Sequence, residues 1–411
     1  MRVRVVVTGI GMLCPLGDSA RTFFESALKG ISKIGPVTKF DASNLPVRFG
    51  GEIRHEELKD EIRRTRLQEM PRSAAWAVLA ARKAVQDGEL ALERENPYTI
   101  NVTMGVASPG LQVFQDQAVA LHQGRADAVS PLTPVLANPA AAAIQISQDL
   151  GLHGEVTNFS SSCSSSASAI GYGMRQIQCG WADCVLAGGV DEGVSEIYLA
   201  SFGNGDVLSR RNDDPGHASR PFDRQRDGYV LGDAACVLLL EEYERAKRRG
   251  APIYCELLGY GATHDADSPR RVGRSEEAGA QAVDNALRNA GCPADEIDYY
   301  CAHGTSSRWT DIRETRMVKR VFRERAARVP CSSIKSMIGH PLGASGAMQT
   351  ATAALAIRHQ AIPPTINLSE PDPECDLDYV AGEAREARVR KAAIYSLGQG
   401  GSNTALILAA C

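Results

Sequence analysis

The 411-residue sequence has no apolar stretch long enough to span a membrane and no excess of basic residues. Its 45 lysines and arginines are outnumbered by 49 aspartates and glutamates, which gives a formal net charge of -4. Because a phosphate-binding surface normally needs a basic excess, this balance argues against nucleic acid as a main partner. The apolar run at residues 5–13 is short, β-branched and interrupted by glycine, so it indicates a buried strand rather than a signal peptide.

Cysteine patterns typical of metal sites are also missing. The chain has eleven cysteines, an odd number, with no CxxC pair and no cysteine and histidine cluster at zinc spacing. This pattern predicts free thiols, no metal site and a protein of the reducing cytoplasm. With 44% hydrophobic and 23% charged residues, the chain is otherwise typical of a globular protein with a large core and two domain-sized units.

The order of predicted elements repeats between the two halves of the chain. The first half predicts strand, helix, strand, helix and strand at residues 2–11, 73–88, 100–108, from about 163 onward, and 183–191. The second half predicts the same order at residues 255–263, 276–291, 297–307, after 336–347, and 392–401. The first helix of each half ends in glycine, the preferred stop at a helix C-terminus. We therefore predict two similar α/β halves, residues 1–250 and 251–411, each a layered sheet covered by helices.

One cysteine stands in an unusual setting. Cys163 lies between two runs of serine in NFSSSCSSSASAIGYG, and apolar residues follow it at helical spacing. A thiol at a helix N-terminus lies at the positive end of the helix dipole, near free backbone N–H groups, and both favour the thiolate. Most cysteines in such a chain are buried packing residues, but the small serines and the strand-turn-helix placement resemble a turn that presents a nucleophile. We therefore predict that Cys163 is a nucleophile.

Three further motifs are candidates to complete a site with Cys163. CAHGTSS has His303 just after a predicted buried strand, and SSIKSMIGHPLGASGA has Lys335 five residues before His340. SLGQGGSN, residues 396–403, is a glycine loop whose backbone N–H groups could approach an oxyanion closely. Taken singly, a histidine or a glycine loop is more often structural. These motifs, however, all follow predicted strands of a repeated fold, so we predict one site shared between the two halves.

These residues and motifs resemble the β-ketoacyl-[acyl carrier protein] synthases of the thiolase superfamily. The resemblance covers nearly the whole chain, through VVVTGIGMLCPLG, Cys163, AHGTSS, SSIKSMIGH and SLGQGGSN. It implies a thiolase-like α/β fold in which two pseudo-duplicated halves form α-β-α-β-α layers. RNDDPGHASRPFD and DPECDLDYV are most similar to the ketosynthase α subunits of bacterial type II polyketide systems.

The resemblance implies a decarboxylative Claisen condensation of malonyl carrier protein with an acyl chain held on Cys163. His303 and His340 would hold the malonyl thioester carbonyl and the enolate that forms when CO2 leaves. A developing enolate oxyanion needs preorganised donors, and neutral imidazoles provide them. Lys335 would lie behind the histidines, with Glu314 as its expected partner; a purely structural ion pair is the alternative for these two.

Further roles follow from the same resemblance. The backbone N–H groups of Cys163 and Gln399 would form the oxyanion hole, and Thr305 and Ser307 would bind the pantetheine arm. No cofactor is expected to be tightly bound, because phosphopantetheine arrives on the acyl carrier protein. That protein and either a second copy or a chain-length-factor-like subunit are the expected partners, giving a homodimer or a heterodimer. The candidate docking residues for the acidic carrier protein are Arg63, Arg64, Arg66, Arg270, Arg271 and Arg274, which are otherwise ordinary solvated surface.

Three positions depart from the family's pattern. Gln399 stands where the family nearly always has a phenylalanine gate beside the nucleophile, which suggests an unusual acyl chain, such as a polyene or an aryl chain; neutral drift is the alternative. Asp206 stands where relatives often offer a basic residue to the carrier protein. Trp309 is bulkier than the usual residue and is expected to shape the malonyl entrance.

Three other functions stay open. A thiolase would have a second cysteine in the C-terminal glycine loop, and GQGG has none. A non-catalytic chain-length-factor-like subunit would lack the nucleophile, whereas Cys163 is present. Elongation in housekeeping fatty acid synthesis is the third alternative, and the sequence favours type II polyketide assembly over it.

Overall fold

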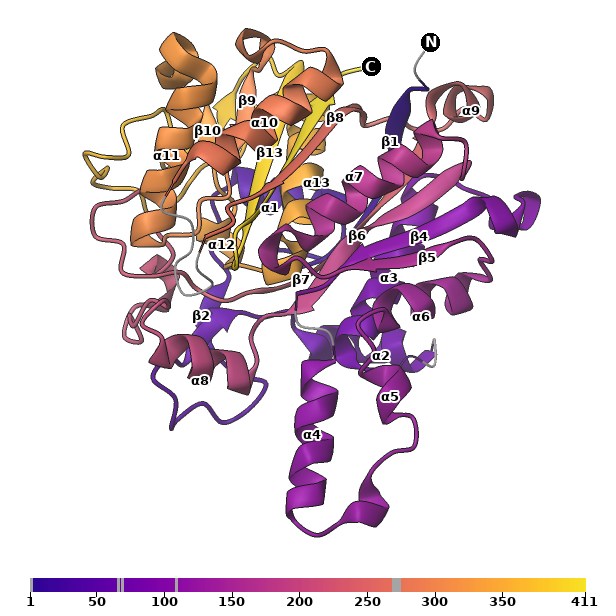
Figure 1. The fold of residues 1–411 in the computed structure, drawn as a ribbon. Coiled ribbons are helices and arrows are strands. Elements are labelled where there is room, and N and C mark those ends of the chain that lie inside the picture. Colours follow the sequence, from indigo (N-terminus) through magenta and orange to yellow (C-terminus); the bar gives the residue numbers. More distant parts are fainter. Residues whose placement is uncertain (1–2, 65–66, 68–69, 108–109, 268–274) are drawn as a thin grey trace.

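The computed structural model describes residues 3–64, 67, 70–107, 110–267 and 275–411. Ten strands form one sheet in the order β10-β9-β13-β14-β8-β1-β7-β6-β4-β5 (Figure 1). Five strands come from the first part of the chain: β1 (Val5–Leu13), β4 (Ile100–Gly105), β5 (Val156–Phe159), β6 (Cys184–Glu192) and β7 (Asp233–Glu242). Five come from the second part: β8 (Cys255–His264), β9 (Tyr299–Cys301), β10 (Cys331–Ser332), β13 (Lys391–Gly398) and β14 (Ser402–Ala409).

The two sets of five strands have the same topology. Outward from the middle of the sheet, the order is β1-β7-β6-β4-β5 on one side and β8-β14-β13-β9-β10 on the other. On each side the first two pairings are antiparallel and the last two are parallel. The sides join where Val5–Val7 of β1 pair with Cys255–Leu257 of β8. The repeat seen in the sequence is therefore a repeat of sheet topology.

The helices of the main layers are α3 (Arg72–Asp87), α6 (Ala141–Leu150), α7 (Ser165–Gln178), α10 (Glu277–Ala290), α11 (Arg308–Phe322) and α13 (Ser345–His359). The other helices are α1 (Ala20–Leu28), α2 (His55–Arg64), α4 (Leu111–His122), α5 (Thr133–Leu136), α8 (Glu196–Asn204), α9 (Tyr243–Arg248) and α12 (Lys335–Ile338). Two small antiparallel pairs complete the described structure: β2 (Ile34–Pro36) with β3 (Phe49–Gly51), and β11 (Ala361–Ile362) with β12 (Arg385–Glu386).

The helices and the sheet form alternating layers. α3 covers β1, β7 and β6, and α10 covers β8 and β14. Between the two sides, α7 packs against β6 and β4, α13 packs against β13, and the two helices contact each other (Figure 1). This is the α-β-α-β-α layering that the sequence predicts. Because the two central helices are the ones that follow Cys163 and His340, their N-terminal ends bring those residues together.

The central helices are built largely from small residues. In α13, every residue from Ser345 to Ile357 is buried, so this helix has no exposed polar face and shows little helical periodicity in its sequence. In α7, a Cβ atom on Gly171 would lie 2.2 Å from the Tyr260 ring, so only glycine fits there. The small side chains allow the two layers of strands to pack closely around this pair of helices.

Several predicted boundaries differ from the observed ones. The strand predicted at 297–307 is limited to Tyr299–Cys301, because the chain then leaves the sheet to form part of the site. The helix at 276–291 ends as predicted, with Gly291 in the left-handed region at φ +62. Gly88 ends α3 at φ -81 instead, so no left-handed stop forms there. None of the helices in the described residues has both the length and the apolar character needed to cross a membrane.

Candidate active site

Cys163 lies on a 3₁₀ turn, Ser162–Ser164, between β5 and α7. Its side chain is buried, and Ser162 before it has φ +57, a left-handed conformation that is uncommon for a non-glycine residue. The surrounding serines hold the turn by local hydrogen bonds. The Ser164 hydroxyl donates to the Ser161 carbonyl oxygen at 2.8 Å, and the Ser161 N–H donates to the Ser165 hydroxyl at 2.9 Å. The serine runs therefore have a structural function in presenting the thiol.

His340 reaches the thiol from the equivalent turn before α13. Its Nε2 lies 3.1 Å from Cys163 Sγ, and its Nδ1 lies 3.0 Å from the Ser345 hydroxyl. Its backbone N–H donates to the Val230 carbonyl at 2.7 Å, and its carbonyl accepts from the Gly232 N–H at 3.0 Å. The imidazole is thus held at both ends and faces the nucleophile. Ser345 is a functional candidate that the sequence analysis missed, because its contact with His340 depends on the turn geometry.

His303 completes the group. Its ring lies perpendicular to that of His340, with 5.4 Å between centroids. Its Nδ1 is buried and has no hydrogen-bond partner among the described residues. The backbone of His303 is fixed from two sides: its N–H donates to Glu314 Oε1 at 2.7 Å, and its carbonyl accepts from Lys335 Nζ at 2.6 Å.

Lys335 and Glu314, the predicted pair, interact through their charges, and each also binds the His303 backbone. The Glu314 carboxylate accepts hydrogen bonds from the N–H groups of His303 and Gly304 and from the Tyr300 hydroxyl, each at 2.7 Å. The Lys335 ammonium group donates to the His303 carbonyl at 2.6 Å. Both side chains are buried, so the two charges hold one peptide segment between them.

Burial determines the protonation of the two imidazoles. It lowers the pKa of His303 and of His340 well below the usual histidine range, and the charge of Lys335 lowers both further. Both rings are therefore neutral at pH 7 and each offers one N–H donor. Burial also lowers the pKa of Lys335 and raises the pKa of Glu314.

The thiol differs from the expectation. Burial raises the pKa of Cys163 above its ordinary value of 9.0, whereas the helix N-terminus was expected to lower it. The Ser162 hydroxyl, the backbone N–H of Gln399 and the charge of Lys335 oppose this rise without reversing it. The resting group is therefore the thiol, and His340 is the neighbouring base that can take its proton.

This shift predicts the pH dependence of alkylation. Because the thiolate is the reactive form, the rate of iodoacetamide modification at Cys163 should keep rising from pH 7 to pH 9 without reaching a plateau. Peptide mass spectrometry of protein quenched at each pH measures the rate at this residue. A rate that reaches its plateau below pH 8 would contradict the raised pKa.

A cavity of about 980 Å³ joins these residues. The lining residues are Ala107, Ser162, Cys163, Tyr198, Phe202, Val207, Tyr229, His303, Thr305, Ser307, Trp309, Thr310, Ile312, Arg313, Arg316, His340, Leu342, Glu374, Leu397 and Gln399. An aromatic wall runs from α8 to the site, in which Tyr198 stacks on Phe202, and Tyr229 meets Phe202 and His340 edge-on. The volume fits a long acyl or pantetheine group.

Gln399, Thr305 and Ser307, the other residues that the sequence analysis assigns to the site, also line the cavity. Gln399 is exposed, and its backbone N–H is close enough to the Cys163 thiol to lower the pKa of that group. Trp309 lines the cavity as well and is 77% exposed.

The docking residues are only partly described. Arg63 is exposed on α2, while Arg64 ends the same helix and its side chain is outside the described set. Arg66, Arg270, Arg271 and Arg274 lie outside the described residues. Asp206 is exposed and pairs with Arg210 at 2.5 Å.

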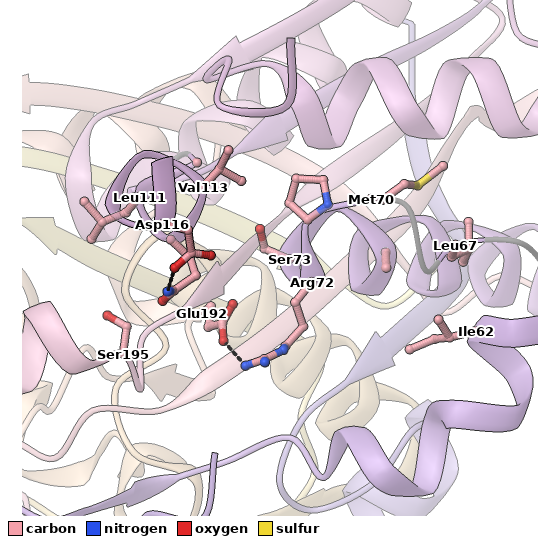
Figure 2. Close-up of a pocket in the computed structure, with 14 residues that line it drawn as sticks. Ile62, Leu67, Met70, Arg72, Ser73, Leu111, Val113, Asp116, Glu192 and Ser195 are labelled. Atoms are coloured by element: carbon pink, nitrogen blue, oxygen red, sulfur yellow. Dashed lines mark hydrogen bonds and ion pairs between the residues drawn. The ribbon is translucent and has the colours of Figure 1, made fainter. Parts of the chain in front are cut away.

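A second cavity, of about 340 Å³, is separate from this site. It lies between α2, α3 and α4, where Arg72 forms an ion pair with Glu192 (Figure 2). None of the predicted catalytic residues lines it, and the described residues contain no cluster of histidine, cysteine and acidic side chains that could hold a metal ion.

Comparison with known proteins now identifies the family. Residues 2–246 match the N-terminal domain of beta-ketoacyl synthases, and residues 254–369 match the C-terminal domain. The chain belongs to the β-ketoacyl synthase family.

Individual relatives agree with this assignment over their full length. A 3-oxoacyl-[acyl-carrier-protein] synthase 2 of Synechocystis is 38% identical over 408 residues, which cover 98% of this chain and 97% of the relative. A type II polyketide ketosynthase, solved with its acyl-carrier protein and a bound hexaketide, is 28% identical with a TM-score of 0.93. The ishigamide ketosynthase/chain length factor is 32% identical with a TM-score of 0.91. Both structures cover 100% of either chain.

The family assignment confirms the fold and the enzyme class that the sequence predicts. This β-ketoacyl synthase has the mixed α/β, thiolase-like fold with N-terminal and C-terminal domains. It is an acyltransferase that forms carbon-carbon bonds by condensing substrates bound to acyl carrier protein.

Proposed function

We propose that this β-ketoacyl synthase acts in type II polyketide assembly, with Cys163, His303 and His340 as its catalytic residues. The observation that supports this proposal most strongly is that His340 Nε2 lies 3.1 Å from Cys163 Sγ, with His303 beside it in the same cavity. In this proposal, residues 1–250 contribute the nucleophile and residues 251–411 contribute the two histidines.

Acyl transfer is the first step. The Cys163 sulfur attacks the thioester carbonyl of an acyl carrier protein, and His340 Nε2 takes the thiol proton. The backbone N–H groups of Cys163 and Gln399 stabilise the tetrahedral oxyanion. The carbon-sulfur bond to phosphopantetheine then breaks, and the departing thiolate receives the proton from His340. The lowering of the Cys163 pKa by the Gln399 N–H supports this donor role, because the reacting carbon would be bonded to that sulfur.

Condensation follows with malonyl carrier protein. The bond to the carboxylate breaks, CO2 leaves, and the electron pair forms an enolate whose oxygen accepts N–H bonds from His303 and His340. The enolate carbon attacks the acyl-cysteine carbonyl, and the carbon-sulfur bond breaks to release Cys163 and a β-ketoacyl carrier protein. The neutral state of both imidazoles supports this role.

The Ser345 hydroxyl allows His340 to serve in both steps. A hydroxyl can accept a hydrogen bond from Nδ1 or donate one to it. When it accepts, His340 has a lone pair at Nε2 for the thiol proton. When it donates, His340 has an N–H at Nε2 for the enolate.

The rest of the cavity suits the substrate arms. Thr305 and Ser307 would bind pantetheine near the opening, and Lys335 and Glu314 would hold the His303 peptide in position. Phosphopantetheine delivered by the carrier protein is the only prosthetic group this mechanism uses. Docking of the acidic carrier protein would use Arg63 and the other predicted arginines.

The partner is proposed to be a second copy or a chain-length-factor-like subunit. Helices α4 and α5 project from the body of the molecule (Figure 1). Exposed apolar side chains on these helices and just before α5 include Phe114, Leu121, Leu132 and Val135, which are 49% to 57% exposed. Such a patch favours burial against another chain. The ketosynthase/chain length factor among the solved relatives supports this expectation.

Polyketide assembly is distinguished from fatty acid elongation by repeated condensation. Incubated with malonyl carrier protein and an acyl carrier protein, the enzyme should extend the chain more than once without reduction of the new keto group. Mass spectrometry of the carrier protein measures this, with one CO2 released per two carbons added. A single extension, even when the partner subunit is present, would favour the fatty acid alternative, which the 38% identical Synechocystis relative supports.

A further inference from the structure

The Gln399 turn, residues 399–401, is pressed against the nucleophile loop. It joins β13 to β14. A Cβ atom on Gly398 would lie 2.3 Å from the Ser161 carbonyl oxygen, so the two backbones are in direct contact. The backbone N–H of Gln399 is close enough to the Cys163 sulfur to lower the pKa of the thiol. A small displacement of this turn would therefore move an oxyanion donor away from the reacting carbon.

Arg313, in the first half of α11, forms hydrogen bonds with three other segments of the chain near this turn. Its Nη2 donates to Asp265 Oδ1 at 2.7 Å and to Asn403 Oδ1 at 3.2 Å. Its Nε donates to the Ser275 carbonyl at 2.7 Å. Asp265 follows β8 and Asn403 lies at the start of β14, so one guanidinium group ties the end of β8 to the strand that follows the turn.

The same network continues to the turn itself. The backbone N–H of Asp265 donates to the Gly401 carbonyl at 2.8 Å, and the Asn403 amide donates to the same carbonyl at 3.0 Å. The Asn403 amide also donates to Asp265 Oδ1 at 2.8 Å, and the Tyr395 hydroxyl donates to Asn403 Oδ1 at 2.6 Å. The last carbonyl of the turn is therefore held by two groups that Arg313 positions.

Burial sets Arg313 apart from other arginines of α11. Its side chain is 5% exposed and that of Asp265 is 6% exposed, whereas Arg320 of the same helix is 53% exposed in its pair with Glu277. Arg313 also lines the catalytic cavity. Burying a charge costs free energy unless its partners are well placed. The buried pair of Arg313 and Asp265 therefore suggests a role in the site rather than in packing alone.

We propose that Arg313 is a positioning residue for acyl transfer, which holds the Gln399 N–H at the oxyanion through Asp265 and Asn403. This inference rests on the proposed role of the Gln399 N–H. Malonyl decarboxylation uses the imidazoles of His303 and His340 instead. A substitution of Arg313 should therefore slow acyl transfer and leave decarboxylation nearly unchanged.

The test compares those half-reactions in Arg313→Ala, Arg313→Lys and the wild type. Acetyl, hexanoyl and decanoyl carrier proteins report acyl transfer by intact mass, and malonyl carrier protein alone reports decarboxylation by CO2 release. Arg313→Ala should slow acyl transfer by about 10-fold to 100-fold. Decarboxylation should change by less than about threefold. Arg313→Lys keeps the charge without the forked donors and should recover part of the rate.

Two further variants separate positioning from folding. Arg320→Ala removes an exposed arginine from the same helix and should leave both rates unchanged. Because Arg313→Ala leaves the Asp265 carboxylate unpaired, the double variant Arg313→Met/Asp265→Asn removes both charges and should restore the melting temperature while acyl transfer stays slow. Wild-type acyl transfer in the double variant, or an equal loss of both half-reactions, would overturn the proposal. If the wild type itself transfers no acyl group, the proposed function fails instead.

Discussion

The Cys163→Ala variant is expected to lose acyl transfer and condensation by about 10⁴-fold or more, because no other group in the cavity can form the thioester. In the described structure the sulfur has few polar neighbours: it lies 3.1 Å from His340 Nε2 and 3.7 Å from the Ser162 hydroxyl, and the backbone N–H of Gln399 is close enough to affect its pKa. The turn itself is held by the serines. The melting temperature should therefore stay close to that of the wild type.

Cys179→Ala is the matched control for this experiment. Cys179 is exposed at the C-terminal end of α7, the helix that begins just after Cys163. Its loss should leave acylation unchanged. A Cys163→Ala protein that still gains an acyl mass and forms a β-ketoacyl product at a comparable rate would show that another residue is the nucleophile.

Replacing the two histidines by alanine should have different effects on the half-reactions. His303→Ala should lower malonyl decarboxylation by about 10² to 10³-fold, because one of two enolate donors is lost. Acyl transfer should change little, since in the described residues the thiol is hydrogen-bonded to His340 and not to His303. His340→Ala should impair both steps, because its Nε2 lies 3.1 Å from Cys163 Sγ.

The His303 variant should also stay folded. Lys335 and Glu314 bind the backbone carbonyl and N–H of His303, and these bonds survive the loss of the imidazole. CO2 release from malonyl carrier protein and acyl transfer from an acyl carrier protein, measured on the same preparations, separate the two roles. Equal losses in both half-reactions for His303→Ala, with an unchanged melting temperature, would contradict the assignment of His303 to decarboxylation alone.

The sequence analysis predicted the repeated fold because the strand and helix order is visible in apolar periods. It missed β7 and β14, although both are nearly fully buried strands. β14 follows β13 after a short turn, and β7 follows a long irregular segment. Both are continuous apolar runs, so they lack the alternation of apolar and polar residues that indicates a strand. The strand predicted at 297–307 was too long, because Ala302–Ser307 carries polar contacts that draw the backbone out of the sheet.

Only those site residues that lie in a recognisable sequence motif could be predicted. Cys163, His303, His340 and Gln399 lie in motifs of unusual composition, and the fold brings them to one cavity. The contact geometry was not predictable, because it depends on pairs far apart in the chain. Arg313 and Asp265 are 48 residues apart, and nothing in their local sequence indicates the pair. Lys335 likewise meets a backbone carbonyl rather than a side chain, which no residue pattern reveals.

The central claim is that the acyl chain is held on Cys163 before condensation. The most direct measurement is a two-step mass experiment: the wild type is incubated with acyl carrier protein, digested and mapped, and a parallel sample is chased with malonyl carrier protein. We predict one acyl group on the peptide that contains Cys163, and its disappearance in the chase as a β-ketoacyl carrier protein two carbons longer forms. An acyl group on another residue, or no acyl mass while product still forms, would contradict the account.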